Sequence, residues 1–393
     1  MLFNPTGLSL FRILLVGLAW SVPVASSGLV VAAEKTVRVF ILAGQSNMEG
    51  AGQIRINPKK ENKGAGSLEF LVRSPRTAKR FAHTVDKDGG WVVRDDVWIW
   101  YLGRHGGLTA GYGARKTTIG PEFQFGHVVG RHFRDPVLII KTAWGGKSLV
   151  RDFRPPSAGG EVGPFYRKMI AHVREVLAAK DNLFPALKNH RAVLSGFGWH
   201  QGWNDGLKMP WVREYEQNMV HLIADLRRDL KAPGLPVVIA NSGFGGIGQK
   251  VDRRVKLVQA QAAVAHRPEL KSTVTTFDTR PFFRPAEQSP SRQGYHWNGN
   301  AETYFLIGDA MAREMIKLVA ARPGSRLRGR RPGSAAGWVV RRFPPPAETP
   351  SPRSSVSHAG GRGCRSAATR GWLPSPTLEP RCGSAAPIPV RVR

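Results

Sequence analysis

Five short, nearly continuous apolar segments alternate with segments of helical periodicity along the middle of this 393-residue chain. An apolar run without polar alternation is typical of a strand that is buried on both faces. Strands of this kind, joined by helices, form a parallel sheet with helices on both sides. The alternation therefore predicts an α/β domain. The expected strands are 36–43, 136–143, 191–199, 236–241 and 272–277, and the expected helices are 164–180, 212–230, 256–266 and 300–321.

The start of the chain has the composition of a secretory signal peptide. Residues 1–33 carry one charge, Arg12, followed by the apolar stretch 13–25 and by small residues at 31–33, which predict cleavage before Glu34. An uncleaved N-terminal anchor is the alternative, although the apolar stretch is shorter than the ~20 residues of a membrane span. Both interpretations predict an exported protein, periplasmic or secreted, and cleavage would leave no stable membrane insertion.

The last part of the chain differs from the rest in its composition and charge. Residues 322–393 contain 14 arginines, no lysine and two glutamates, a net charge of +12 within a total of +30. No apolar periodicity persists there, so this part is expected to be a disordered tail. It is either a basic tail for anionic surfaces or the product of a coding accident such as a frame shift, and the second is slightly preferred. Nucleic-acid binding is not predicted, because the arginines lie in no recognisable recognition module.

The central part, 34–321, is expected to be one large α/β domain. Both cysteines, Cys364 and Cys382, lie in the tail, so this part has no thiol nucleophile, disulfide framework or cysteine-ligated zinc site. It holds 43 basic and 26 acidic residues, a net charge of +17. Such a balance favours acidic surroundings or polyanionic glycans.

Residues 53–118 interrupt the alternation. This segment is polar, rich in glycine and too long for a plain loop, so we expect an insertion of loops or short hairpins beside the active-site edge. Its aromatic residues either stack on sugar rings or pack the insertion onto the domain, and the sequence leaves both readings open. They are Trp91, Trp98, Trp100, Tyr101 and Tyr112.

Polar motifs follow the first three expected strands, and a fourth motif precedes the last helix. Because the carboxyl ends of parallel strands meet at one edge of a sheet, we expect these motifs to converge there. They are Gly44-Gln45-Ser46, Trp144-Gly145-Gly146, Gln201-Gly202-Trp203-Asn204-Asp205 and Tyr295-His296.

The residue types in these motifs are those that acyl transfer requires. A serine hydroxyl such as that of Ser46 is a weak nucleophile until a base, here His296, removes its proton. Paired glycines let backbone N–H groups approach a substrate, and an asparagine such as Asn204 can donate to a developing oxyanion. Each motif also has a plain structural interpretation, as a turn or as an N-cap.

In this order, the motifs resemble blocks I, II, III and V of the SGNH hydrolase superfamily. The strings AGQSNMEG, WHQGWND and NAETYFLIG further resemble the sialate O-acetylesterase and acetylxylan esterase-like branch of carbohydrate esterases, over about 36–317. The resemblance implies a flavodoxin-like three-layer α/β/α sandwich with about five parallel strands. It also implies that neither a metal nor another cofactor is needed.

The resemblance implies a role for each matching residue. Ser46 would be the nucleophile and, through its N–H group, one oxyanion donor. Gly146, or its neighbour Gly145, would give a second backbone donor, and Asn204 the side-chain donor. His296 would be the general base. Further residues would contact the substrate or support the motifs: Gln45, Gln201, Gly145 and Asp205.

One position departs from the pattern. The superfamily usually places an aspartate three residues before the histidine, and here that residue is Gln293. In the serine-protease template, replacing the orienting acid by its amide lowers turnover about 10⁴-fold. Either another acid serves, with Glu287 and Asp278 as upstream candidates, or the enzyme works as a Ser–His dyad.

The predicted function is an exported serine esterase that removes O-acetyl groups from sugars or polysaccharides. A lipase or thioesterase of the same superfamily is a second hypothesis, and a glycan-binding module that has lost turnover is a third. The sequence names neither the sugar nor the oligomeric state.

Overall fold

The computed structural model describes residues 34–59 and 62–321, so the predicted signal peptide and the predicted basic tail lie outside the described residues. Seven strands form a sheet in the order β4-β3-β6-β1-β7-β8-β9. All neighbours in it run parallel except β4, which pairs antiparallel with β3. The strands of this sheet are β1 (Thr36–Gly44), β3 (Val97–Tyr101), β4 (Arg104–Gly107), β6 (Val137–Ala143), β7 (Arg191–His200), β8 (Val237–Ala240) and β9 (Val274–Phe277).

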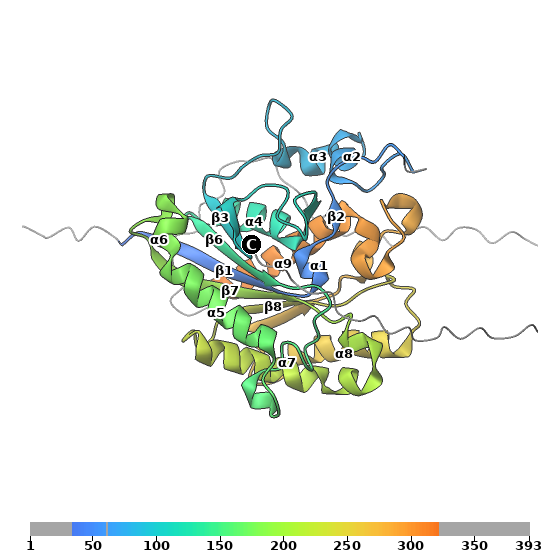
Figure 1. The fold of residues 1–393 in the computed structure, drawn as a ribbon. Coiled ribbons are helices and arrows are strands. Elements are labelled where there is room, and N and C mark those ends of the chain that lie inside the picture. The colour runs from blue at the N-terminus through green and yellow to red at the C-terminus, as the bar shows by residue number, and fades with distance from the viewer. Residues whose placement is uncertain (1–33, 60–61, 322–393) are drawn as a thin grey trace, which may run out of the picture. The chain divides into compact units, whose positions relative to one another are not determined.

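Helices cover both faces of this sheet (Figure 1). On one face α5, α7 and α8 pack with the side chains of Val37, Val39 and Ile41 in β1. On the other face α4 and α9 pack with Phe40 and Leu42 of the same strand. The predicted three-layer α/β fold is confirmed. The longer helices are α4 (Pro121–His132), α5 (Pro164–Ala178), α7 (Met209–Asp229), α8 (Asp252–Val264) and α9 (Ala301–Ala320).

The sheet has more strands than the expected five, and the reason lies in the segment 53–118. This segment contributes β3 and β4, a hairpin whose first strand pairs in parallel with β6. Trp100 and Tyr101 of β3 are buried, and Trp91, Trp98 and Tyr112 pack against the hydrophobic clusters of the domain. The aromatic residues therefore pack the segment onto the domain.

The rest of that segment forms short elements near α9. Phe81 and Phe305 are in ring contact there, with centroids 4.4 Å apart. A two-stranded ladder joins the beginning of the segment to its end. The elements are β2 (Gly52–Gln53), α2 (Leu68–Arg73), α3 (Ala78–Phe81) and β5 (Thr118–Ile119), and a further short helix elsewhere is α6 (Lys180–Leu183).

Helix α4 is absent from the elements that the sequence predicts. Every residue from Pro121 to Val129 is buried, because α4 lies between the sheet and α9. A helix buried all round has no polar stripe, and periodicity is then a weak signal. No helix in the part of the chain that the structure describes is long and apolar enough to cross a bilayer.

Strand β1 lies at the centre of the sheet, with β6 on one side and β7 on the other. From β1 the chain forms β3, β4 and β6 on one side and then crosses to β7 on the other side, which makes the carboxyl end of β1 a topological switch point. Ligands of open α/β sheets bind in the crevice at such points. The motifs that follow β1, β6 and β7 consequently lie at one edge.

Candidate active site

Ser46 begins the short helix α1 (Ser46–Glu49) directly after β1. The turn requires glycine at position 44, where a Cβ atom would lie 2.2 Å from the carbonyl oxygen of His200. As the first helical residue, Ser46 has an N–H group that no acceptor among the described residues satisfies. A half-buried hydroxyl and a free N–H donor therefore meet at this turn.

The glycine pair after β6 presents backbone to the same edge. Gly146 has φ +68°, a left-handed conformation that favours glycine, and both Gly145 and Gly146 are exposed. Within residues 34–59 and 62–321, the Gly146 N–H group has no hydrogen-bond acceptor. It can therefore donate to a bound oxygen.

Gln45 connects the serine turn to the third motif. Its side chain is buried, and its Oε1 accepts hydrogen bonds from Gln201 Nε2 (3.3 Å), the Gly202 N–H group (3.0 Å) and the Asn204 N–H group (3.4 Å). Its Nε2 donates to Asn204 Oδ1 at 3.3 Å. Both ends of the Gln45 side-chain amide are thus bonded to other groups of the protein.

Asn204 joins the third motif to the second. Its Nδ2 donates to the Gly146 carbonyl oxygen at 2.6 Å, while Gln45 holds its Oδ1. An amide nitrogen carries two hydrogens, so one remains for a ligand. Three of the four motifs are therefore joined in a single hydrogen-bonded cluster.

Asp205 supports this cluster through buried hydrogen bonds. The fully buried carboxylate accepts hydrogen bonds from the N–H groups of Leu149 and Val150 and from Gln201 Nε2 at 2.6 Å. Burial raises the pKa of Asp205 to about 6, against the opposing effect of these donors. Asp205 and Gln201 anchor the chain just after the glycine pair.

His296 lies in the irregular turn η7 (Gly294–Gly299) before α9. Its side chain is half-buried, and burial lowers its pKa below the ordinary value. The next two residues, Trp297 and Asn298, both have positive φ values, 52° and 55°. Two consecutive non-glycine residues in this region are costly, and such a turn persists only when its surroundings hold it.

Asn47 and Tyr304 hold the histidine turn against the serine turn. Asn47 Nδ2 donates to the Tyr295 carbonyl oxygen at 2.9 Å, and the Tyr304 hydroxyl donates to Asn47 Oδ1 at 2.9 Å. The same hydroxyl lies 3.2 Å from the His296 carbonyl oxygen. The fourth motif thereby joins the other three.

No carboxylate among the described residues bonds to the ring of His296. Asp278 pairs with Arg280 at 2.8 Å, and Glu287 lies 3.7 Å from Arg292. Gln293 is exposed, and its carbonyl oxygen accepts the backbone N–H of His296 at 2.8 Å. Within the same residues, no hydrogen bond joins the His296 ring to Ser46, and catalytic hydrogen bonds are often long before substrate binds.

A buried ion pair supports the helix that begins with Ser46. Lys141 of β6 donates to Glu122 Oε2 (2.7 Å), to the Glu49 carbonyl oxygen (2.6 Å) and to the Tyr112 carbonyl oxygen (2.7 Å). Burial lowers the pKa of Lys141 and raises that of Glu122, while their mutual attraction opposes both shifts. The Lys141 ammonium thus fixes the end of α1.

These supporting residues were missed when the sequence was considered alone. Lys141 is the one charged residue of β6, and this feature is visible in the sequence. Asn47 and Tyr304 lie inside the strings that carry the resemblance, but nothing local shows that they meet. Among the described residues, no group of three or more histidine, cysteine, aspartate or glutamate side chains could hold a metal ion.

A cavity of about 370 Å³ opens beside the histidine turn. Trp203, next to Asn204, and the exposed Tyr295, next to His296, form part of its wall, with ring centroids 5.5 Å apart. The Arg254 guanidinium lies 4.4 Å from the Trp203 ring centroid. An aromatic and cationic surface therefore adjoins the motif cluster.

Comparison with sequence families shows that residues 36–317 match the family described as carbohydrate esterase, sialic acid-specific acetylesterase. Comparison with curated proteins gave no match.

Several solved structures are similar in fold at low sequence identity. A protein from Arabidopsis thaliana is 18% identical, with a TM-score of 0.47, over 72% of this chain and 98% of that one. A carbohydrate acetylesterase from Xanthomonas citri is 14% identical (TM-score 0.46; 72% and 56% covered). NanS is 13% identical (TM-score 0.45; 74% and 99% covered).

Proposed function

Because the chain belongs to the sialic acid-specific acetylesterase family of carbohydrate esterases, and is therefore an ester hydrolase for acetylated carbohydrate, we propose that it works through an acyl-enzyme on Ser46. The observation that carries this proposal is the hydrogen-bonded cluster that joins all four motifs. Through Gln45, Asn204, Asn47 and Tyr304, residues more than 150 positions apart are held together at one sheet edge.

In this mechanism the Ser46 hydroxyl attacks the acetyl carbonyl carbon, and the neutral His296 ring takes the hydroxyl proton. The N–H groups of Ser46 and Gly146, with Asn204 Nδ2, donate to the oxyanion that develops. Histidine then gives the proton to the leaving sugar oxygen as the acyl C–O bond breaks, and the sugar departs with a free hydroxyl. Water, deprotonated by the same ring, attacks the acetyl group on Ser46; the Ser46 ester bond breaks, Oγ takes the proton back from histidine, and acetate leaves.

With no acid on the His296 ring, we propose that the pair acts as a dyad. Asp278 and Glu287 are the matched controls, since each pairs with an arginine. Ser46→Ala is expected to abolish hydrolysis of 4-nitrophenyl acetate, whereas Asp278→Asn and Glu287→Gln retain the rate within about threefold. Retained activity in Ser46→Ala would refute the nucleophile, and a loss of about 10⁴-fold in either acid variant would show a third member.

We propose that the sugar side of the substrate occupies the cavity beside Trp203 and Tyr295. Its wall combines ring faces with the polar groups of Arg254 and Glu287. Such a surface suits a sugar better than a long acyl chain, which separates this proposal from a lipase or thioesterase. Acetyl esters should therefore be cleaved much faster than octanoyl esters, and acetate release by the unmodified protein would exclude a module that only binds.

We further propose that the protein is exported by its N-terminal segment. The support is the charge and apolar pattern of residues 1–33. When the whole chain is produced in a bacterial host, the mature protein is expected outside the cytoplasm with Glu34 as its first residue. Intact chain found only in the cytoplasm would contradict export.

A further inference from the structure

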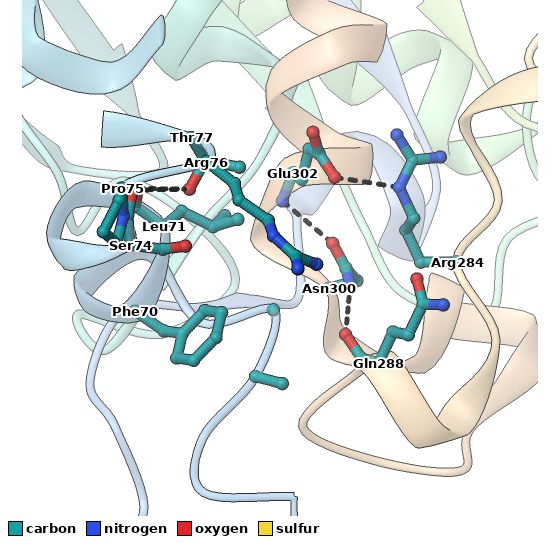
Figure 2. Close-up of a pocket in the computed structure, with 12 residues that line it drawn as sticks. Phe70, Leu71, Ser74, Pro75, Arg76, Thr77, Arg284, Gln288, Asn300 and Glu302 are labelled. Carbon is teal, nitrogen blue, oxygen red and sulfur yellow. Dashed lines mark hydrogen bonds and ion pairs between the residues drawn. The ribbon is translucent and has the colours of Figure 1, made fainter. Parts of the chain in front are cut away.

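A second cavity, of about 490 Å³, lies between the end of α2 and the segment that leads into α9 (Figure 2). Its volume falls within the range of about 300–1,000 Å³ that is typical of small-molecule sites. We call it the Arg76 pocket. Its wall includes Phe70, Ser74, Arg76, Arg284, Gln288 and Glu302.

The Arg76 pocket carries an excess of positive charge. Its one carboxylate, Glu302, is largely buried and is paired with both Arg80 and Arg284, the latter at 2.8 Å. Figure 2 shows the Arg76 side chain extending from the end of α2 into the space between the two walls. Among the described residues, no carboxylate forms an ion pair with Arg76. An anionic group in this pocket would therefore meet an arginine that pairs with no carboxylate of residues 34–59 and 62–321.

The remaining wall offers contacts for a sugar ring. Phe70 is half-buried, and within residues 34–59 and 62–321 its ring has no aromatic partner. The side-chain amide of Gln288 is exposed and bonds to no other described group, and the hydroxyl of the half-buried Ser74 likewise has no hydrogen-bond partner among the described residues. An apolar ring face, an amide and a hydroxyl are the groups that the C–H face and the hydroxyls of a sugar require.

We propose that the Arg76 pocket is a second carbohydrate site, which takes a hexuronic acid residue of an acidic polysaccharide. The sugar carboxylate pairs with the Arg76 guanidinium, in a charge-assisted hydrogen bond. The sugar ring lies against Phe70, and Gln288 bonds to its hydroxyls. This inference concerns binding alone and does not depend on the proposed mechanism at Ser46.

The position of the pocket suits a polymer. The segment 284–288 lines both cavities: Arg284 and Gln288 face the Arg76 pocket, and Pro285, Ala286 and Glu287 face the cavity beside Trp203. One chain segment therefore separates the proposed acetyl-sugar site from the uronic acid site. A polysaccharide held at Arg76 would keep its acetylated residues near Ser46.

Calorimetric titration of the Ser46→Ala protein tests the inference without turnover. The probes are a β-1,4-linked glucuronic acid tetramer and cellotetraose, which differ only in the carboxylates. The acidic tetramer is expected to bind, and cellotetraose about 10-fold or more weakly. Arg76→Ala should weaken the acidic tetramer by about 10- to 100-fold, and Phe70→Ala should weaken both probes.

Arg73→Ala is the matched control, because Arg73 is an exposed arginine at the end of α2, three residues before Arg76, and does not line the pocket. It should change affinity by no more than about twofold, since distant surface charges are screened. Equal weakening by Arg73→Ala and Arg76→Ala, or no binding of the acidic tetramer, would overturn the inference. Acetate or phosphate that competes as well as the tetramer would show a site for free anions instead, and would also overturn it.

Discussion

At the scale of single residues, Asn204 serves two parts of the candidate site. One hydrogen of its amide group fixes the Gly146 carbonyl oxygen, and the other is available to the substrate. Gln45 holds the opposite end of the same amide, which sets its orientation. The proposed side-chain donor is thus oriented by the protein itself, and such preorganisation is what makes an oxyanion donor effective.

Asn204→Ala is expected to lower kcat for 4-nitrophenyl acetate by about 10²–10³-fold, because it removes one oxyanion donor. Gln217→Ala, a change of an exposed amide on α7, is a control that should leave kcat unchanged. A loss below about threefold in Asn204→Ala would show that this amide only braces the glycine turn.

The second residue-scale prediction concerns pH. His296 must be neutral to accept a proton, and burial lowers its pKa below 6.5. The acid limb of a plot of kcat/KM against pH is therefore expected at a midpoint below 6.5. Gln293→Asp would add a negative charge near the ring, favour the charged imidazole and move that limb to higher pH. A wild-type midpoint above 6.5 would contradict the prediction.

At the scale of elements, two contacts position α1, the helix that begins with Ser46, the proposed nucleophile. Lys141 binds the carbonyl oxygen at its last residue, Glu49, and Asn47 connects it to the histidine turn and to α9. The Lys141 and Asn47 side chains are buried, and hydrogen bonds inside a protein are electrostatically stronger than in water. The distance between serine and histidine therefore depends on the packing of β6 and α9.

Tyr304→Phe tests the connection to α9. Asn47 Oδ1 loses its donor and the turn at His296 loses a hydroxyl neighbour, which is expected to cost about 1–3 kcal/mol of the free energy of unfolding and to lower kcat. Tyr166→Phe removes a hydroxyl bonded to Asp229, far from the motifs in the sequence, and should affect stability but not kcat. Equal kcat values in the two variants would contradict a positioning role for Tyr304.

Lys141→Met tests the ion pair. Removing one partner leaves the Glu122 carboxylate buried and unpaired, which typically costs about 3–5 kcal/mol. The double variant Lys141→Met with Glu122→Gln is expected to be more stable than the single variant, since no unpaired charge remains. Urea unfolding measures both, and a double variant that is less stable than the single one would refute this account.

At the scale of the whole molecule, a buried neutral histidine contributes to the pH dependence of stability. His200, at the end of β7, is fully buried, and burial lowers its pKa to about 4. Its Nδ1 lies 3.1 Å from the Ala240 carbonyl oxygen, to which it donates. In the unfolded chain this ring titrates near 6.5, so the unfolded state binds more protons between these values.

The contribution of His200 to the free energy of unfolding is therefore expected to be largest above pH 6.5 and to be lost as the pH drops toward 4. This contribution is about 3 kcal/mol, from about 1.4 kcal/mol for each pKa unit. His200→Asn keeps a donor near Nδ1 but cannot titrate, so its stability should depend less steeply on pH. Urea unfolding at several pH values measures both slopes, and equal slopes would contradict the assignment to His200.

The sequence by itself determined the layered α/β fold, the order of its elements and the residue types of the four motifs. These depend on local patterns: apolar runs, helical periodicity, and glycine or polar residues at the ends of strands. Local patterns did not predict helix α4, because its full burial removes the periodic pattern. They did not predict strands β3 and β4 either, because β3 joins the sheet by pairing with β6, which is distant in the sequence.

Only the tertiary structure decided how the motifs are connected. The bond from Gln45 to Asn204 spans 159 positions, and the bond from Tyr304 to Asn47 spans 257. No local pattern encodes such a pair, since each residue alone is equally compatible with a turn or a surface position. The reason is physical: buried polar groups must find partners, and the packing of distant elements determines which partners lie within reach.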